Sequence, residues 1–257
     1  MLISPWTQKT RELPKMYENL AVIMYSHSSY SDAWQMFMGQ FDKYFPKEVK
    51  RYVFVDDDKG IVGENWTTVL YKDSDSYNER FSHCLKSVSE DYCILNHEDM
   101  PLYSEPNFGE LERCLNILES EQKLHYIKLI KGGELRDIPY NSVPNLFSIP
   151  HDSQSIFAVQ PTLWKTEKLK VVYQETKVDN IRQFEPQSQN TCRQNSIYGA
   201  YYFDSEPLRG LYHHDSSIYP FIATAIVKGR WNLAEYYFEI TELAKEYNID
   251  LKERGTL

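Results

Sequence analysis

Leu20-Ala21-Val22-Ile23-Met24-Tyr25 is an unbroken apolar run in a chain of 257 residues. A run without alternation is typical of a strand that is covered on both faces, as in a parallel sheet. It ends in the polar residues Ser26-His27-Ser28-Ser29. Large apolar residues then recur at helical spacing from Trp34 to Phe45, and Pro46 follows. This part of the chain therefore predicts a strand, a polar loop and a helix.

Strand and helix patterns continue to alternate as far as about residue 130. Further apolar runs predict strands at 52–55, 67–71, 92–95 and 125–130. Between them, Ser76 with Glu79 and Asn107 with Glu110 have the spacing of helix N-caps. Such alternation predicts an α/β fold, namely a Rossmann-like single domain with a mostly parallel central sheet and helices on both faces.

The second half of the chain is less regular. It predicts short strands at 147–149, 156–159 and 223–227, a helix at 163–174, and a helix that Asn232 and Glu235 open. Residues 178–196 are polar and receive no assignment. Since no Gly/Ser-rich or Pro-rich linker divides the chain, we expect residues 1–257 to form one domain.

Acidic residues outnumber basic ones, 37 against 28, for a formal net charge of −9. Nucleic acids and anionic membranes are bound by positive surfaces, so we expect neither as the main partner. The four cysteines form no C-x-x-C pair, which predicts free thiols in a reducing compartment. The N-terminus does not resemble a signal peptide, and no apolar run approaches the ~20 residues that span a bilayer. We therefore expect a cytoplasmic protein without a transmembrane segment.

Polar residues follow three of the predicted strands directly. Ser26-His27 comes after the first strand, Asp56-Asp57-Asp58 after the second, and Asn96-His97-Glu98-Asp99 after the fourth. In an open parallel sheet, ligands bind at the carboxyl ends of the strands. Acids at the ends of buried strands usually have a cationic partner, so these segments are the candidate binding site.

Common nucleotide and hydrolase motifs are absent from the sequence. It contains no G-x-G-x-x-G, no G-x-x-x-x-G-K-[ST], no H-E-x-x-H and no G-x-S-x-G. A diphosphate that is bound without a glycine-rich loop generally needs a divalent metal, and Mg²⁺ or Mn²⁺ held by one or two carboxylates can bridge its oxygens.

The order of these segments resembles the GT-A glycosyltransferases, whose Asp-x-Asp motif ends an apolar strand and holds a metal-bound nucleotide diphosphate. The matching segment is Tyr92-Cys93-Ile94-Leu95-Asn96-His97-Glu98-Asp99, in which His97 replaces the first Asp of the motif. Later segments are similar to small bacterial and viral members of the family: Gln160 to Lys165 followed by Phe184-Glu185, Lys228 to Trp231, and Tyr247 to Asp250.

The resemblance implies a transfer of sugar from a UDP- or GDP-sugar to a glycan or glycoprotein acceptor. About 18–130 would bind the nucleotide sugar and about 131–257 the acceptor. Ser26, His27 and either Asp56 or Asp57 would contact the donor. Arg80 would pair with the donor's sugar or with a nearby acid.

The resemblance also implies a metal site and a sugar-stacking residue. Asp99, helped by Glu98, would hold Mn²⁺ or Mg²⁺, and His214 would reach the same metal. The indole of Trp164 would stack on a sugar face.

An inverting transfer needs a base that removes the proton of the acceptor hydroxyl, whereas a retaining transfer needs none. Glu185 is our candidate base, because it lies in a polar segment between Phe184 and Pro186. One alternative is a non-catalytic module of the same fold that binds nucleotide sugar or glycan. Another is a nucleotidyltransferase, but the glycine-rich basic loop expected there is missing from Ser26 to Tyr30.

Overall fold

The apolar run forms β1 (Leu20–Tyr25), which lies inside a nine-stranded sheet. This sheet is the centre of the computed structural model, which describes residues 15–132, 135–205 and 215–257. Its strand order is β3-β2-β1-β4-β8-β5-β9-β7-β6. The other strands of this sheet are β2 (Lys50–Val55), β3 (Thr67–Leu70), β4 (Tyr92–His97), β5 (Tyr126–Lys128), β6 (Ile138–Pro139), β7 (Leu146–Ser148), β8 (Thr162–Lys165) and β9 (Gly199–Tyr202).

The predicted mostly parallel sheet is confirmed. β3, β2, β1 and β4 are parallel neighbours, and β5 is parallel to β9. β8 runs antiparallel between β4 and β5, and β7 runs antiparallel to β9. The carboxyl ends of β2, β1 and β4 therefore lie side by side at one edge of the sheet.

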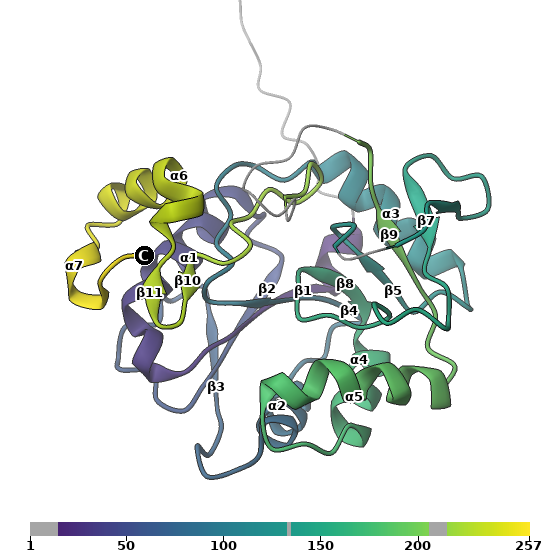
Figure 1. Ribbon diagram of the computed structural model, residues 1–257, viewed down its shortest axis with the longest axis horizontal. Helices are drawn as coiled ribbons and strands as arrows, with labels where there is room; N and C mark the ends of the chain where they lie inside the picture. The colour runs from purple at the N-terminus through teal and green to yellow at the C-terminus, as the bar shows by residue number, and fades with distance from the viewer. Residues whose placement is uncertain (1–14, 133–134, 206–214) are drawn as a thin grey trace, which may run out of the picture.

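Helices cover both faces of the sheet, as the alternating pattern predicted (Figure 1). One apolar cluster joins the sheet to α1, α3 and α6, and a second cluster on the other face joins it to α2, α4 and α5. The helices on the first face are α1 (Ser31–Tyr44), α3 (Phe108–Ser120) and α6 (Leu233–Glu246). Those on the second face are α2 (Tyr77–Leu85), α4 (Thr166–Glu175) and α5 (Ile181–Gln194).

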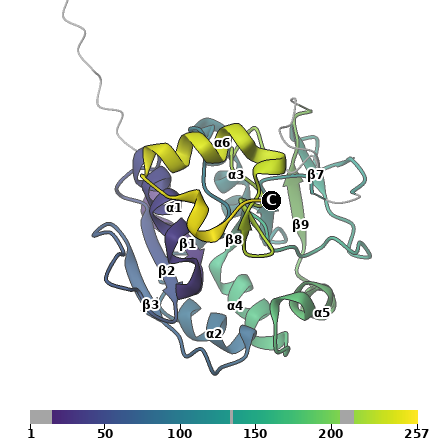
Figure 2. The same cartoon turned by 60° about the vertical axis from the view of Figure 1, so that its left-hand side comes forward.

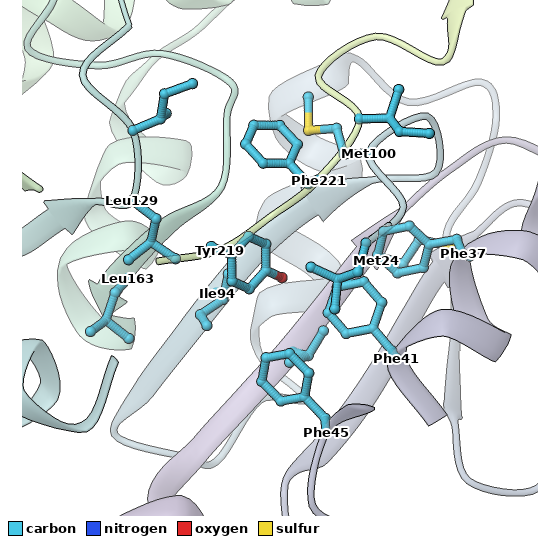
Figure 3. Close-up of a cluster of buried hydrophobic side chains, with 14 of the residues drawn as sticks. Met24, Phe37, Phe41, Phe45, Ile94, Met100, Leu129, Leu163, Tyr219 and Phe221 are labelled. Carbon is cyan, nitrogen blue, oxygen red and sulfur yellow. The ribbon is translucent and has the colours of Figure 1, made fainter. Parts of the chain in front are cut away.

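The first cluster contains one buried polar link between distant parts of the chain. Tyr219 lies among Met24, Phe41 and Ile94 in the core (Figure 3), and its hydroxyl donates to Asn96 Oδ1 at 3.0 Å. The Asn96 side-chain amide is 3.3 Å from the Ile23 carbonyl oxygen. This link ties the segment around Tyr219 to β1 and β4, next to the edge where the strands end.

Two of the predicted helix caps are confirmed in full, and the third is confirmed in its position only. Glu79 accepts from the backbone amide of Ser76 at 3.0 Å, and Asn107 accepts from that of Glu110 at 3.2 Å. Asn232 is the N-cap residue of α6, as predicted, but its side chain makes no capping bond. Its amide donates instead to the Thr224 carbonyl oxygen at 3.1 Å, and so connects α6 to the preceding segment.

Three element predictions of the second half are wrong. Residues 156–159 form no strand. The range 163–174, predicted as one helix, begins with β8 and becomes helical only at Thr166. The strand predicted at 223–227 is only β10 (Ile226–Val227), which pairs with β11 (Arg230–Trp231) outside the main sheet. These short apolar runs are ambiguous in sequence, because helix and strand patterns coincide over four or five residues.

The unassigned range 178–196 contains α5. Its buried side includes the polar residues Ser188, Gln189 and Thr191 besides Phe184, so no apolar helical period is visible in the sequence. Pro186 lies inside the helix, where its ring removes one backbone hydrogen bond. Tertiary contacts stabilise this helix, and the sequence of residues 178–196 alone does not reveal them.

The first prediction concerns Gly199 of β9, on which the Tyr126 ring lies directly. A Cβ at Gly199 would be 2.0 Å from Tyr126 Cζ, and Tyr126 is fully buried. We expect Gly199→Ala to lower the free energy of unfolding by about 2–3 kcal/mol, since overpacking forces buried groups apart. The corresponding fall in melting temperature is about 5–10 °C for a chain of this size.

Gly63→Ala is the matched control, because a Cβ there would meet only Trp66 Cδ1, at 3.9 Å. Chemical denaturation of both variants measures the difference. Equal stabilities of the two variants would contradict the close approach of Tyr126 to the backbone of β9.

Candidate functional site

The three polar segments that follow β1, β2 and β4 meet at one edge of the sheet, as expected from their parallel neighbours. Successive residues of a strand point to opposite faces. On β2, Phe54 packs on the α2 side and Val55 on the α1 side. Asp56 therefore continues the α2 face and Asp57 the α1 face, so the two adjacent acids lie in different surroundings.

Asp56 is bonded to the loop that follows β1. It accepts from the Ser28 backbone amide at 2.6 Å and from the Ser28 hydroxyl at 2.7 Å. Burial opposes ionisation of Asp56, but these hydrogen bonds outweigh burial and hold its pKa below the usual value. The charged carboxylate thus holds the loop of η2 (Ser28–Tyr30) at the end of β2.

His27 connects Asp56 to a second acid. The backbone amide of Ser29 donates to His27 Nδ1 at 3.1 Å, so a neutral ring carries its proton on Nε2. His27 Nε2 is 3.5 Å from an oxygen of Asp56 and 3.5 Å from one of Asp73. Asp73 in turn pairs with Arg80 Nη2 at 2.9 Å. The predicted donor-binding residues His27, Asp56 and Arg80 are therefore one connected group, and the acid that pairs with Arg80 is Asp73.

Ser26 is a buried part of this edge. Its hydroxyl accepts from the Trp34 indole at 2.7 Å, and its carbonyl oxygen accepts from the Tyr71 hydroxyl at 2.8 Å. The Tyr71 ring stacks on Tyr25, with centroids 5.4 Å apart, and carries the Arg80 guanidinium at 5.3 Å. These contacts fix where β1 ends and where Arg80 lies.

The side chains of His97 and Glu98 point to opposite faces. The His97 ring lies 5.4 Å from that of Tyr25 on the α2 face, and burial lowers its pKa to about 4. Glu98 is buried on the α1 face, where Ser26 and Arg254 are the groups that favour its charged form. His97 is therefore neutral near pH 7 and directed away from the neighbouring acid.

Glu98 and Asp99 are costly to ionise. Burial raises the pKa of both, and the charge of Asp99 raises that of Glu98 further. Ser26 and Arg254 lower the pKa of Glu98 without cancelling these effects. Glu98 is buried and Asp99 half-buried, and acids whose pKa values are raised in this way cluster at functional sites.

Arg254 is a site residue that the sequence did not reveal. It lies on α7 (Leu251–Arg254), which packs beside α1 (Figure 2). Its guanidinium forms a bidentate pair with Asp32, with Nε 2.8 Å from Oδ2. It also donates to the Ser29 carbonyl oxygen at 2.9 Å and stacks on Tyr30 at 4.6 Å. No motif marks this arginine, because only folding brings residue 254 to the loop after β1.

Two predicted site residues lie elsewhere. Asp57 is exposed and pairs with Lys59 at 2.8 Å, so it does not join the Asp56 group. Trp164 is 2% exposed and packs on Tyr126 with ring centroids 4.3 Å apart. The structure thus places Trp164 in the core and not on a sugar-binding surface, which corrects the prediction. His214 lies outside the described residues.

The predicted base is Glu185. It lies on α5, where the Val159 amide donates to its Oε1, and it lines a hollow of about 480 Å³.

Within residues 15–132, 135–205 and 215–257, no group of three or more His, Cys, Asp or Glu side chains has the geometry of a metal site. Glu98 and Asp99 offer carboxylate oxygens, the ligand type that Mg²⁺ and Mn²⁺ prefer. One or two carboxylates together with phosphate oxygens and water are a common Mg²⁺ shell. The pair therefore fits an ion that arrives with a phosphorylated ligand.

Comparisons with known proteins show the fold. No family model matches the sequence, and no curated protein matches it. A crystal structure of S. aureus TarS is 15% identical to this chain, with a TM-score of 0.50; the match covers 91% of this chain and 40% of that one. A crystal structure of TarS 1-349 is 17% identical, with a TM-score of 0.49, and the match covers 91% of this chain and 67% of that one. The chain has a Rossmann-like α/β fold.

Among the described residues, none of the helices has the length and apolar character that crossing a membrane requires. The four cysteines are free and buried, as predicted from their spacing.

Proposed function

We propose that this protein is a glycosyltransferase of the GT-A type, which moves a sugar from a UDP- or GDP-sugar to a glycan or glycoprotein acceptor. Two findings support the proposal. The fold is similar to that of TarS, a glycosyltransferase. The observation that carries it is the pair Glu98 and Asp99, two acids with raised pKa values at the end of a central strand, beside the connected group of His27, Asp56 and Arg80.

The donor would lie along this edge of the sheet. In the proposal, Asp56 and His27 contact the nucleoside, and Glu98 and Asp99 hold Mn²⁺ or Mg²⁺. When bound, the ion supplies positive charge to the diphosphate leaving group. Arg80 is held by Asp73 and by the Asp75 carbonyl oxygen, 2.8 Å from its Nε. Because protein groups alone fix the position of its charge, that charge would lie near the nucleoside before the donor binds.

The acceptor side would use Glu185 as base. The acceptor hydroxyl oxygen bonds to the anomeric carbon as the bond from that carbon to the diphosphate oxygen breaks. The hydroxyl proton passes to Glu185, and the nucleoside diphosphate leaves with the electron pair. The Val159 amide donates a hydrogen bond to Glu185 and orients its carboxylate. A base needs a fixed orientation to accept the proton of the acceptor hydroxyl.

The second prediction is donor binding. We expect a saturating UDP- or GDP-sugar with Mn²⁺ to raise the melting temperature by about 5–10 °C, because a ligand at 100 times its Kd adds about 2.7 kcal/mol to stability. Asp56→Asn should remove most of this shift, since the variant weakens the loop that carries Ser28. Differential scanning fluorimetry with a panel of nucleotide sugars measures it.

Asp57→Asn is the matched comparison, because the Asp57 carboxylate is exposed and paired with Lys59. It should keep the full shift. No shift of the unmodified protein with any common nucleotide sugar would contradict donor binding. A shift without donor hydrolysis or transfer would favour the non-catalytic module. A shift with nucleoside triphosphates and release of pyrophosphate would favour a nucleotidyltransferase.

A further inference from the structure

Residues 151–160, between β7 and β8, contain no helix or strand, yet side chains of α5 hold their backbone in place. Arg193 donates to the Ser153 carbonyl oxygen at 2.8 Å. Gln189 accepts from the Phe157 amide at 2.9 Å and donates to the Phe157 carbonyl oxygen at 2.6 Å. The segment is therefore an ordered platform and not a loose connection.

A buried lysine holds the same platform from the sheet. Lys128 of β5 is 1% exposed, and its Nζ donates to the Ser155 carbonyl oxygen. Burial lowers the pKa of Lys128 to about 8, although the charge of Glu185 opposes this shift. Burying an amine for one backbone contact is unfavourable for stability. A backbone segment held in this way is ordered before any ligand arrives, and such preorganisation lowers the entropic cost of binding.

The platform separates two adjoining hollows. The first, of about 480 Å³, includes Gln160, Arg182 and Glu185 in its wall. The second, of about 470 Å³, includes Arg136 and Asp152. Gln154 and Ser155 belong to both walls, so the hollows meet across them. Each volume lies in the range of about 300–1,000 Å³ that small-molecule sites occupy.

The lining mixes apolar with polar residues, and its charged residues are balanced in sign. Arg182 faces the first hollow together with Glu185, and Arg136 faces the second together with Asp152. Neither hollow therefore carries an excess of one sign that would select an ionic ligand. Gln160 Nε2 is buried at the wall without a hydrogen-bond partner among the described residues. Amide donors and acceptors of this kind suit hydroxyl groups.

We propose that the two hollows bind consecutive units of an uncharged glycan chain, with the terminal unit beside Glu185 and the preceding units across Gln154 towards Arg136. The inference rests on the proposed transferase function, since it names the acceptor of that same reaction. It assigns the acceptor to oligosaccharides or polysaccharides, which should bind in preference to single sugars.

An array of neutral glycans from one to six units, with sialylated and sulfated glycans beside them, tests the inference in the presence of UDP and Mn²⁺. We expect binding to neutral glycans of two or more units and about tenfold weaker binding to monosaccharides, as loss of one or two hydrogen bonds implies. Arg136→Ala, in the wall of the second hollow only, should reduce the affinity for chains about tenfold and leave that for monosaccharides unchanged. Gln187→Ala, on the same helix as Glu185 but outside both walls, should change neither.

Lys128→Met tests the platform itself. It should weaken chain binding while the donor-induced melting shift stays as in the unmodified protein. The Arg136 variant decides the question if Lys128→Met fails to fold. Binding to monosaccharides alone, to anionic glycans alone or to no glycan would overturn the inference. If a nucleotide sugar still raised the melting temperature, those results would not contradict the transferase proposal. Binding of glycan chains without any shift of the melting temperature by a nucleotide sugar would instead contradict the transferase proposal. It would still support glycan binding in the two hollows.

Discussion

Glu98→Gln is expected to make the protein more stable and, at the same time, inactive. The substitution removes a buried charge that both desolvation and the neighbouring Asp99 oppose. We expect a gain of about 1–2 kcal/mol at pH 8, or about 3–6 °C in melting temperature. Sugar transfer should fall at least about a hundredfold, because the amide replaces a proposed metal ligand.

The pH dependence of this gain has a definite sign. A carboxyl group whose pKa is raised by folding binds more protons in the native state than in the unfolded state, so the free energy of unfolding falls as pH rises from the unfolded pKa through the folded one. Melting temperatures from pH 5 to pH 9 should therefore decline more steeply for the unmodified protein than for Glu98→Gln. Mn²⁺ should reduce the decline in the unmodified protein only.

The control is Glu119→Gln, an exposed glutamate on α3, which should leave both the melting temperature and the transfer rate unchanged. A Glu98→Gln protein that is less stable than the unmodified one at pH 8 would show that Glu98 is a charged structural group. Full transferase activity in that variant would remove Glu98 from the site.

Arg254→Ala is expected to be the most destabilising change near the site. Its guanidinium is mostly buried, with 11% of the side chain exposed, and it pairs with Asp32 and with the Ser29 carbonyl oxygen. Removing it leaves Asp32 without its cation, for which we expect a loss of about 2–4 kcal/mol, or about 6–12 °C. Donor affinity should also fall, because the loop after β1 loses its support. Thermal melting and nucleotide titration measure the two effects.

Two further variants separate charge from geometry. Arg254→Lys keeps the positive charge but not the two-pronged contact with Asp32, so we expect an intermediate loss. Lys252→Ala, an exposed lysine of the same short helix, should behave as the unmodified protein. If the melting temperature of Arg254→Ala equalled that of Lys252→Ala, α7 would not support the loop after β1.

The strands of the first half and their parallel arrangement could be predicted because each strand is a short apolar run with a clear end. The caps at Ser76 and Asn107 could be predicted for a similar reason, since capping depends on residues three positions apart. The position of β8 could not. Its apolar residues precede a helix directly, and its place between β4 and β5 depends on pairing with distant segments.

For the candidate site, too, the sequence predicts some features and tertiary packing decides others. That acids follow β2 and β4 is visible in the sequence, and so is their position at the edge where parallel strands end. Which acid joins which group depends on the face to which each side chain points. The packing on β2 decides that Asp56 and not Asp57 meets Ser28.

Local order along the chain determined the α/β class, the mostly parallel sheet and the edge at which its polar loops gather, because apolar periodicity and cap spacing act over a few residues. Tertiary structure alone decided that Arg254 reaches the loop after β1, that Lys128 is buried beneath residues 151–160, and that Trp164 belongs to the core. These outcomes depend on contacts between residues far apart in sequence, and the energy of such contacts exists only once the sheet has formed.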